Sequence, residues 1–144
     1  MNGYKELYKI FKKNGGVDGG CMAALKSLDE RERTVLHLAI CENDYDFVEW
    51  LVAQGSNVNT QDYYSQSPLQ TAVILSSVAL VKLLLDSGAD PNFQDKYGKT
   101  ALHYSVQIEE PDTRDEVVTA LINSDADKSK KDNLGDTPFE TKWF

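Results

Sequence analysis

Residues 62–72 of this chain read DYYSQSPLQTA, and residues 95–105 read DKYGKTALHYS. The two blocks share an aspartate, a tyrosine-bearing turn and the start of an apolar segment, and they begin 33 residues apart. An earlier copy begins at Asp29, another 33 residues back, and a fourth begins at Asp132, 37 residues after Asp95. A fixed period of this length predicts stacked supersecondary units that form an elongated solenoid.

The second half of each unit repeats in the same way. Residues 48–59 read VEWLVAQGSNVN, residues 81–92 read VKLLLDSGADPN, and a weaker copy at residues 118–127 reads VTALINSDAD. The spacing is 33 residues and then 37, so four extra residues lie between Ser105 and Val118. Because Pro111 cannot continue a helix interior, we expect a longer, acidic inter-helix loop over residues 107–115. Such an insertion is either neutral or a contact loop.

These motifs resemble the ankyrin repeat, whose signature is T-P-L-H-x-A followed by a leucine-rich helix and G-A-D-x-N. The resemblance covers residues 29–139, and several motifs recur at the same phase. It implies an all-α fold, an ankyrin-repeat solenoid of stacked helix pairs with β-turn fingers. Residues 1–144 would form a single domain with a divergent N-terminal cap, three repeats and a truncated last repeat. The corresponding ranges are 1–28, 29–61, 62–94, 95–131 and 132–144.

The two ends of the chain depart from the repeat. Tyrosine, leucine and phenylalanine at helical spacing predict a short amphipathic helix over residues 4–13, and residues 21–25 resemble a second one. Together they occupy the place of a first repeat without its motifs. At the other end, Trp143 and Phe144 follow only the start of a helix. These two aromatic side chains either fold back onto the third repeat or dock on a partner.

Local signals predict where the repeat helices begin, end and bury their side chains. Thr34 can cap the first helix, Pro68 suits a first helical turn, and Gly55 and Gly88 suit the left-handed position after a helix. The aspartates that open the units are typical turn residues that bind their own backbone. The second helix of the first pair is expected to contain Phe47, Val48, Trp50, Leu51 and Val52. The predicted core consists of apolar residues at helical spacing: Leu36, Ala39, Ile40, Leu69, Ala72, Val73, Leu80, Val81, Leu84 and Leu85.

Composition narrows the class of partner and the compartment. The formal net charge of −8 argues against nucleic acid or an anionic membrane as the main partner. The sequence has no apolar run long enough for a membrane span and no secretory signal. Two cysteines, Cys21 and Cys41, in such a chain predict reduced, buried thiols and a cytoplasmic or nuclear location.

Nothing in the sequence favours catalysis, a cofactor or a metal site. The only histidines, His37 and His103, fall at the histidine of the repeat motif, where the resemblance implies a Thr–His hydrogen-bond network between repeats. Gln70 stands at that position in the middle unit, and an amide can partly replace the imidazole as donor and acceptor. Cys41 with His37 lacks any orienting group or oxyanion donor, and no phosphate-binding glycine loop is present. We therefore expect a non-enzymatic protein.

The resemblance places the binding surface on the finger tips and the inner helices. Three tyrosines fall at finger tips, where a core role is geometrically difficult, and tyrosine is frequent at binding hot spots. Ile74 and Leu75 form an apolar pair on the inner helices, which serves either as an interface or as packing between repeats. The predicted partner-binding residues are Gln61, Tyr63, Tyr64, Gln66, Ile74, Leu75, Gln94, Lys96, Tyr97, Lys99, Gln107 and Ile108.

The resemblance therefore predicts a protein–protein interaction module that acts as a small regulatory or adaptor subunit. A protein kinase complex is one partner class, because short ankyrin arrays include inhibitors of cyclin-dependent kinases. An alternative is a mask for a transcription factor, as in inhibitors of NF-kappa-B, with the acidic residues 109–112 blocking a basic surface. A further alternative is a structural fragment of a larger scaffold. No small-molecule substrate is expected.

Overall fold

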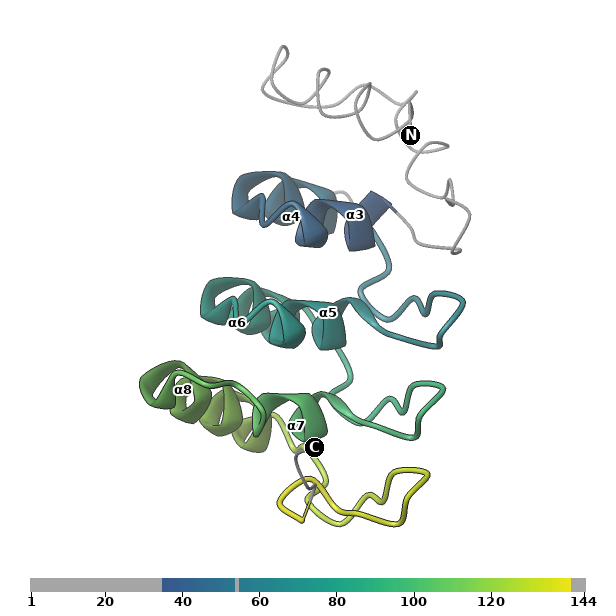
Figure 1. The fold of residues 1–144 in the computed structure, drawn as a ribbon. Helices are drawn as coiled ribbons and strands as arrows, with labels where there is room; N and C mark the ends of the chain where they lie inside the picture. Colours follow the sequence, from purple (N-terminus) through teal and green to yellow (C-terminus); the bar gives the residue numbers. More distant parts are fainter. Residues whose placement is uncertain (1–34, 54, 141–144) are drawn as a thin grey trace.

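The computed structural model describes residues 35–53 and 55–140 and arranges them as three helix pairs stacked in one direction (Figure 1). One helix of each pair belongs to an inner row, next to the loops that project to one side, and the other helix belongs to an outer row. Each helix packs against its partner and against its counterparts in the neighbouring pairs. The inner helices are α3 (Val35–Cys41), α5 (Pro68–Ile74) and α7 (Ala101–Ser105), and the outer helices are α4 (Tyr45–Ala53), α6 (Val78–Asp86) and α8 (Pro111–Asn123).

The predicted helix boundaries at proline and glycine are confirmed. Helix α5 begins with a capping box, in which the Ser67 hydroxyl accepts from the Gln70 N–H and the Gln70 side chain accepts from the Ser67 N–H, with Pro68 in the first turn. Gly55 and Gly88 follow outer helices at φ of +91° and +92°, a conformation that favours glycine. Glycine thus turns the chain out of α4 and α6 toward the next finger, whereas Asp125, at φ of +66°, takes the equivalent position after α8.

The hydrophobic core repeats along the stack. Leucines at equivalent positions of the inner and outer helices are at most 2% exposed. Each repeat therefore contributes two equivalent buried leucine side chains to a continuous core. Leu85 was predicted to be a core residue and is only partly buried against it. The leucines at equivalent positions are Leu36, Leu69 and Leu102 on the inner helices and Leu51, Leu84 and Leu121 on the outer helices.

The four extra residues of the third repeat lengthen a helix, and the predicted loop over residues 107–115 is wrong. Helix α8 has 13 residues, whereas α4 and α6 have nine each. Pro111 is in the first turn, where a missing N–H costs nothing, and the Glu110 carboxylate caps the N–H groups of Asp112 and Thr113. The insertion therefore adds about one turn at the start of α8, and a short turn over residues 106–110 joins α7 to α8.

The finger loops use their aspartates as predicted. The Oδ1 atom of Asp62 accepts from the N–H groups of Tyr64 and Gln66, and Asp95 and Asp132 repeat this pair of bonds in the next two fingers. Main-chain bonds also join neighbouring fingers, because the Lys96 N–H donates to the Tyr64 carbonyl at 2.8 Å. The tips are consequently held by the turn below them and by the finger beside them.

The motif histidines connect repeats, as the resemblance implied. His37 Nε2 lies 3.1 Å from the Gln66 carbonyl oxygen, and His103 Nε2 lies 2.9 Å from that of Asp136. Gln70 takes the same role in the middle repeat, since its Nε2 donates to the Lys99 carbonyl at 2.7 Å. All three side chains therefore reach the equivalent carbonyl of the following finger.

A second connection between repeats was not foreseen from the sequence. Asn59 donates from Nδ2 to the Gly88 carbonyl and accepts the Asp90 N–H on Oδ1. Asn92 makes the same two bonds to the Asp125 carbonyl and the Asp127 N–H. The asparagine that ends the motif G-A-D-x-N is the signal that could have revealed this tie.

Cys41 is exposed, so the prediction of a buried thiol is wrong at this position, which lies at the end of a helix. The predicted cap over residues 1–28, with Cys21, lies outside the described residues. The Thr34 cap, the Asp29 turn and the placement of Trp143 and Phe144 lie outside them as well.

Candidate binding surface

Three tyrosines stand at the finger tips with much of their surface exposed. Tyr63 is 61% exposed, Tyr97 55% and Tyr64 38%. The rings of Tyr63 and Tyr64 meet edge to face with their centroids 5.4 Å apart, and the Lys96 ammonium lies 5.5 and 5.8 Å from those centroids. This cation–π arrangement holds the aromatic side chains of the second finger against the third.

The predicted finger glutamines mainly support the loops on which the tyrosines stand. Gln61 Nε2 donates to the Ser65 carbonyl at 2.9 Å, and Gln94 Nε2 donates to carbonyls in its own finger and the next. Gln66 Oε1 accepts the Thr71 hydroxyl. These side chains therefore use their amides within the protein, and their closeness to the tips makes them neighbours of the tyrosine surface.

Tyr104 is part of this surface and was missed from the sequence. Its hydroxyl donates to the Asp95 carboxylate, and the Lys99 ammonium lies 5.6 Å from its ring centroid. Burial raises the pKa of the Tyr104 phenol well above its usual value, and the hydrogen bond to Asp95 raises it further. Tyr104 thus fastens the third finger to α7. Tyr104 stands at the variable position x of the motif T-P-L-H-x-A. The family pattern requires no aromatic residue there, so the motif did not single it out.

The inner-helix candidates divide into exposed and buried residues. Ile74 is 47% exposed and Leu75 43%, so this apolar pair lies on the surface at the end of α5. Gln107 is half-buried. Ile108 is only 6% exposed and belongs to the core, so its prediction as a contact residue is corrected. The prediction placed Ile108 by its position in the motif, as if the chain after α7 followed the same path as the chain after α5. The turn over residues 106–110 instead directs Ile108 inward.

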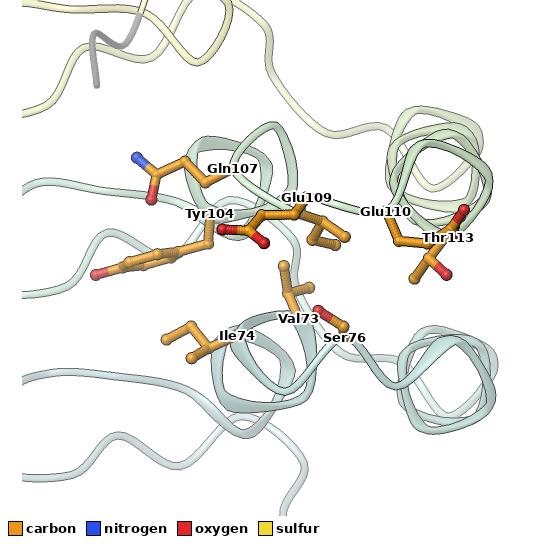
Figure 2. A pocket seen from close by; sticks show the side chains of 9 residues that line it. Val73, Ile74, Ser76, Tyr104, Gln107, Glu109, Glu110 and Thr113 are labelled. Carbon is orange, nitrogen blue, oxygen red and sulfur yellow. Dashed lines mark hydrogen bonds between the residues drawn. The ribbon is translucent and has the colours of Figure 1, made fainter. Parts of the chain in front are cut away.

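An open groove separates the second and third repeats beside these residues. It has a volume of about 590 Å³, and its lining includes Val73, Ile74, Tyr104, Ile108, Glu109 and Glu110. Figure 2 shows Ile74 and Tyr104 extending from the inner helices toward the side of the finger loops, while Glu110 and Thr113 lie at the outer end near α8. The groove therefore begins near the fingers and ends at the extra turn of α8.

The described part of the chain offers no sign of a metal centre or a membrane segment. Over residues 35–53 and 55–140, no three histidine, cysteine, aspartate or glutamate side chains are grouped as metal ligands. Among the helices of the same residues, none combines the length and apolar character of a transmembrane span. The exposed groups of the candidate binding surface are consequently the three finger-tip tyrosines, the pair Ile74 and Leu75, and the carboxylates beside the groove.

Paired helices, hydrogen-bonded fingers and a repeating core define a helical repeat protein whose long face is available for contact. The family model for ankyrin repeats in three copies matches residues 36–132. The chain therefore belongs to the ankyrin-repeat family, whose arrays form protein–protein interaction modules and generally do not catalyse reactions. The predicted fold and family are confirmed.

Several curated proteins share part of this sequence. The ankyrin repeat protein OPG189 of variola virus is 35% identical over 69 residues, which cover 48% of this chain and 11% of the viral protein. RelA-associated inhibitor of Mus musculus is 38% identical over 52 residues, covering 36% of this chain and 6% of that protein. Protein SPT23 of Saccharomyces cerevisiae is 39% identical over 59 residues, covering 41% and 5%. The matched segment thus spans about a tenth or less of these relatives.

Proposed function

We propose that this protein is a non-enzymatic adaptor or small regulatory subunit that holds a protein partner across the second and third fingers and the adjoining inner helices. The observation that carries the proposal is the exposure of Tyr63, Tyr64 and Tyr97 together on neighbouring finger tips. Ile74 and Leu75 add an exposed apolar pair at the end of α5. Large exposed side chains gathered on one face are characteristic of interaction sites.

The rigidity of the fingers supports this assignment. A partner that binds mobile loops must offset the entropy of ordering them. Here the tips are already held by Asp62 and Asp95 and by the main-chain bond from Lys96 to Tyr64. Tyrosine adds a large contact area with few rotatable bonds. The fingers therefore present their aromatic groups with little further loss of freedom on binding.

The net charge of the chain favours a protein partner over nucleic acid or an anionic membrane. A formal net charge of −8 repels nucleic acid and anionic lipid. The groove and the finger tips suit a protein surface, because both are open and distributed over two repeats. No small-molecule substrate forms part of the proposal.

Affinity purification with a matched control tests the proposal. The full chain is compared with a triple variant carrying Tyr63→Ala, Tyr64→Ala and Tyr97→Ala, and with Tyr45→Ala as control, because Tyr45 is 40% exposed on the outer helix α4. Each captured partner is then measured for affinity. We expect the triple variant to bind at least about tenfold more weakly, since truncation of even one hot-spot tyrosine costs about 2 kcal/mol. Equal affinity for all three proteins would contradict the assignment.

A second candidate function is the masking of a transcription factor. It is favoured by the similarity to RelA-associated inhibitor, a protein whose name states an association with RelA, and by the exposed acidic residues Glu109, Glu110 and Asp112 at the start of α8. The test adds the full chain to a fluorescent κB DNA duplex bound by purified RelA and follows DNA release by anisotropy. Release that disappears with Glu109→Lys would support masking, and unchanged anisotropy at micromolar protein would exclude it. A kinase among the captured partners would instead favour a regulatory subunit of a kinase complex.

A further inference from the structure

The groove between the second and third repeats combines an apolar floor with an acidic rim. Val73 and Ile108 are buried side chains of the core, and Ile74 extends the apolar surface outward. Glu109 and Glu110 are exposed at the turn before α8. Glu109 lines the groove, and in Figure 2 its side chain extends from the turn toward the side on which Tyr104 lies. An exposed carboxylate thus borders an apolar groove that is partly open to solvent.

The other charged groups around the groove are already engaged. The Glu110 carboxylate accepts the Asp112 N–H at 3.1 Å and the Thr113 N–H at 2.5 Å. The hydrogen bonds from Thr113 lower the pKa of the Glu110 carboxyl. Arg114 donates from Nη1 to the Ile108 carbonyl at 3.2 Å. Among the described residues, no salt bridge or hydrogen bond engages the Glu109 carboxylate. Among the described residues that line the groove, Glu109 is therefore the carboxylate whose oxygens have no hydrogen-bond or ion-pair partner.

We propose that this groove receives an arginine side chain from a basic, amphipathic segment of the protein partner, a proposal that rests on the proposed binding function and names the partner's chemistry. The methylene stem would lie on the exposed Ile74 and the half-buried ring of Tyr104, above the buried Val73 and Ile108, as long cationic side chains do on apolar surfaces. The guanidinium would meet the Glu109 carboxylate, for which its planar pair of donors is suited. An apolar neighbour in the segment would cover Ile74 and Leu75.

The geometry distinguishes this occupant from others. An enclosed pocket buries most of a small ligand, whereas this groove is partly open to solvent and suits a side chain presented by a protein segment. A purely apolar segment would leave Glu109 facing hydrocarbon, which is unfavourable for a charged group. A basic, amphipathic segment offers apolar groups to the apolar lining and a cation to Glu109. The net negative charge of the whole chain attracts such a segment.

Two synthetic probes test the inference on the full chain. One is a fluorescent octapeptide with a single arginine flanked by leucines and serines, and the other carries neutral citrulline in place of the arginine. Binding is followed by anisotropy and by amide chemical shifts in 15N-labelled protein. We expect the arginine probe to bind about tenfold more tightly than the citrulline probe, to shift amides of residues 73–76 and 104–113, and to weaken as salt rises.

Variants that change the charge at Glu109 test whether this carboxylate binds the arginine. Glu109→Gln should weaken the arginine probe about threefold and Glu109→Lys about tenfold, while both bind the citrulline probe unchanged. The matched control is Glu49→Lys, an equal change of charge on the exposed face of the outer helix α4. Equal losses for Glu109→Lys and Glu49→Lys would show a general attraction to the acidic chain, and equal binding of both probes would show a purely apolar groove. Either result overturns the inference.

The same variants separate this inference from the proposed function. If a captured partner is lost with the triple tyrosine variant and retained in full with Glu109→Lys, the fingers bind the partner and the groove does not receive its arginine. If the partner is retained by both variants, both proposals fail. Loss with both variants supports an interface that runs from the finger tips to the start of α8.

Discussion

The second and third repeats follow one template and differ at the connection between their helices. Residues 75–77 join α5 to α6, whereas residues 106–110 join α7 to α8, and α8 is four residues longer than α6. The packing of the core is similar in the two repeats, because Leu84 and Leu121 are both fully buried at the equivalent position. The surface changes more, since the extra turn places Glu109 and Glu110 beside the groove. Repetition determines the core of this protein, and departures from repetition shape its surface.

Removing either equivalent leucine should have the largest effect. Leu84→Ala and Leu121→Ala each delete a fully buried side chain, and each should lower the free energy of unfolding by about 2–5 kcal/mol. Urea denaturation followed by circular dichroism measures both losses. Similar losses are expected despite the insertion. A loss at Leu121 below about 1 kcal/mol would show that the longer α8 is loosely packed.

The third finger should depend on glycine where the second does not. Gly98 has φ of +74°, and a Cβ built there would lie 2.8 Å from the Asn133 backbone nitrogen in the neighbouring finger. Ser65 occupies the equivalent position at φ of +58°. We expect Gly98→Ala to destabilise the protein by about 1–3 kcal/mol, and Ser65→Gly to be near neutral, both in thermal unfolding. Equal shifts in Tm would contradict the comparison.

The ties between repeats should be interchangeable in chemistry. Gln70→Ala and His103→Ala each delete a buried side chain and one of the two donors to a carbonyl of the next finger, at a cost of about 1–3 kcal/mol. Gln70→His restores the motif histidine and should stay within about 1 kcal/mol of the wild type. Urea titration of the three variants gives the comparison. A severe loss with Gln70→His would mean that the amide reaches its carbonyl by a path that imidazole cannot follow.

The N-cap of the inserted turn should give the smallest effect, visible through pH. Hydrogen bonds from Thr113 lower the pKa of Glu110 in the folded protein below the ordinary value of 4.5. Its stabilising effect is therefore fully present above that value and is lost as pH falls through the folded pKa. The difference in Tm between wild type and Glu110→Ala should be constant near neutral pH and shrink in acid. A difference that grows in acid would reverse the assigned sign.

Much of the fold could be predicted because each signal is local and repeats. Pro68, Gly55 and Gly88 mark helix ends through backbone geometry, and Asp62 marks a turn through its own side chain, so one residue carries each inference. Pro111 misled because proline ends a helix in its interior and begins one in its first turn. The sequence alone does not tell which of these positions Pro111 occupies.

The binding surface was harder to predict than the fold. The exposure of Tyr63, Tyr64 and Tyr97 followed from their place in turns, and the structure agrees on the exposure without testing the contact. Ile108 was placed on the surface by counting from the motif, although the turn after α7 buries it. Tyr104 was overlooked because its role depends on Asp95, nine residues away.

The repeat period, the family, most apolar residues of the core and the turn residues of the fingers could be predicted from the sequence. These features depend on neighbouring residues and on a pattern that returns in every unit. The stacked structure was needed to find that the inserted residues extend α8, that Ile108 is buried, and that Glu109 and Tyr104 line one groove. Burial and proximity between repeats arise from stacking one unit on the next, and stacking depends on contacts between distant residues that no local pattern records.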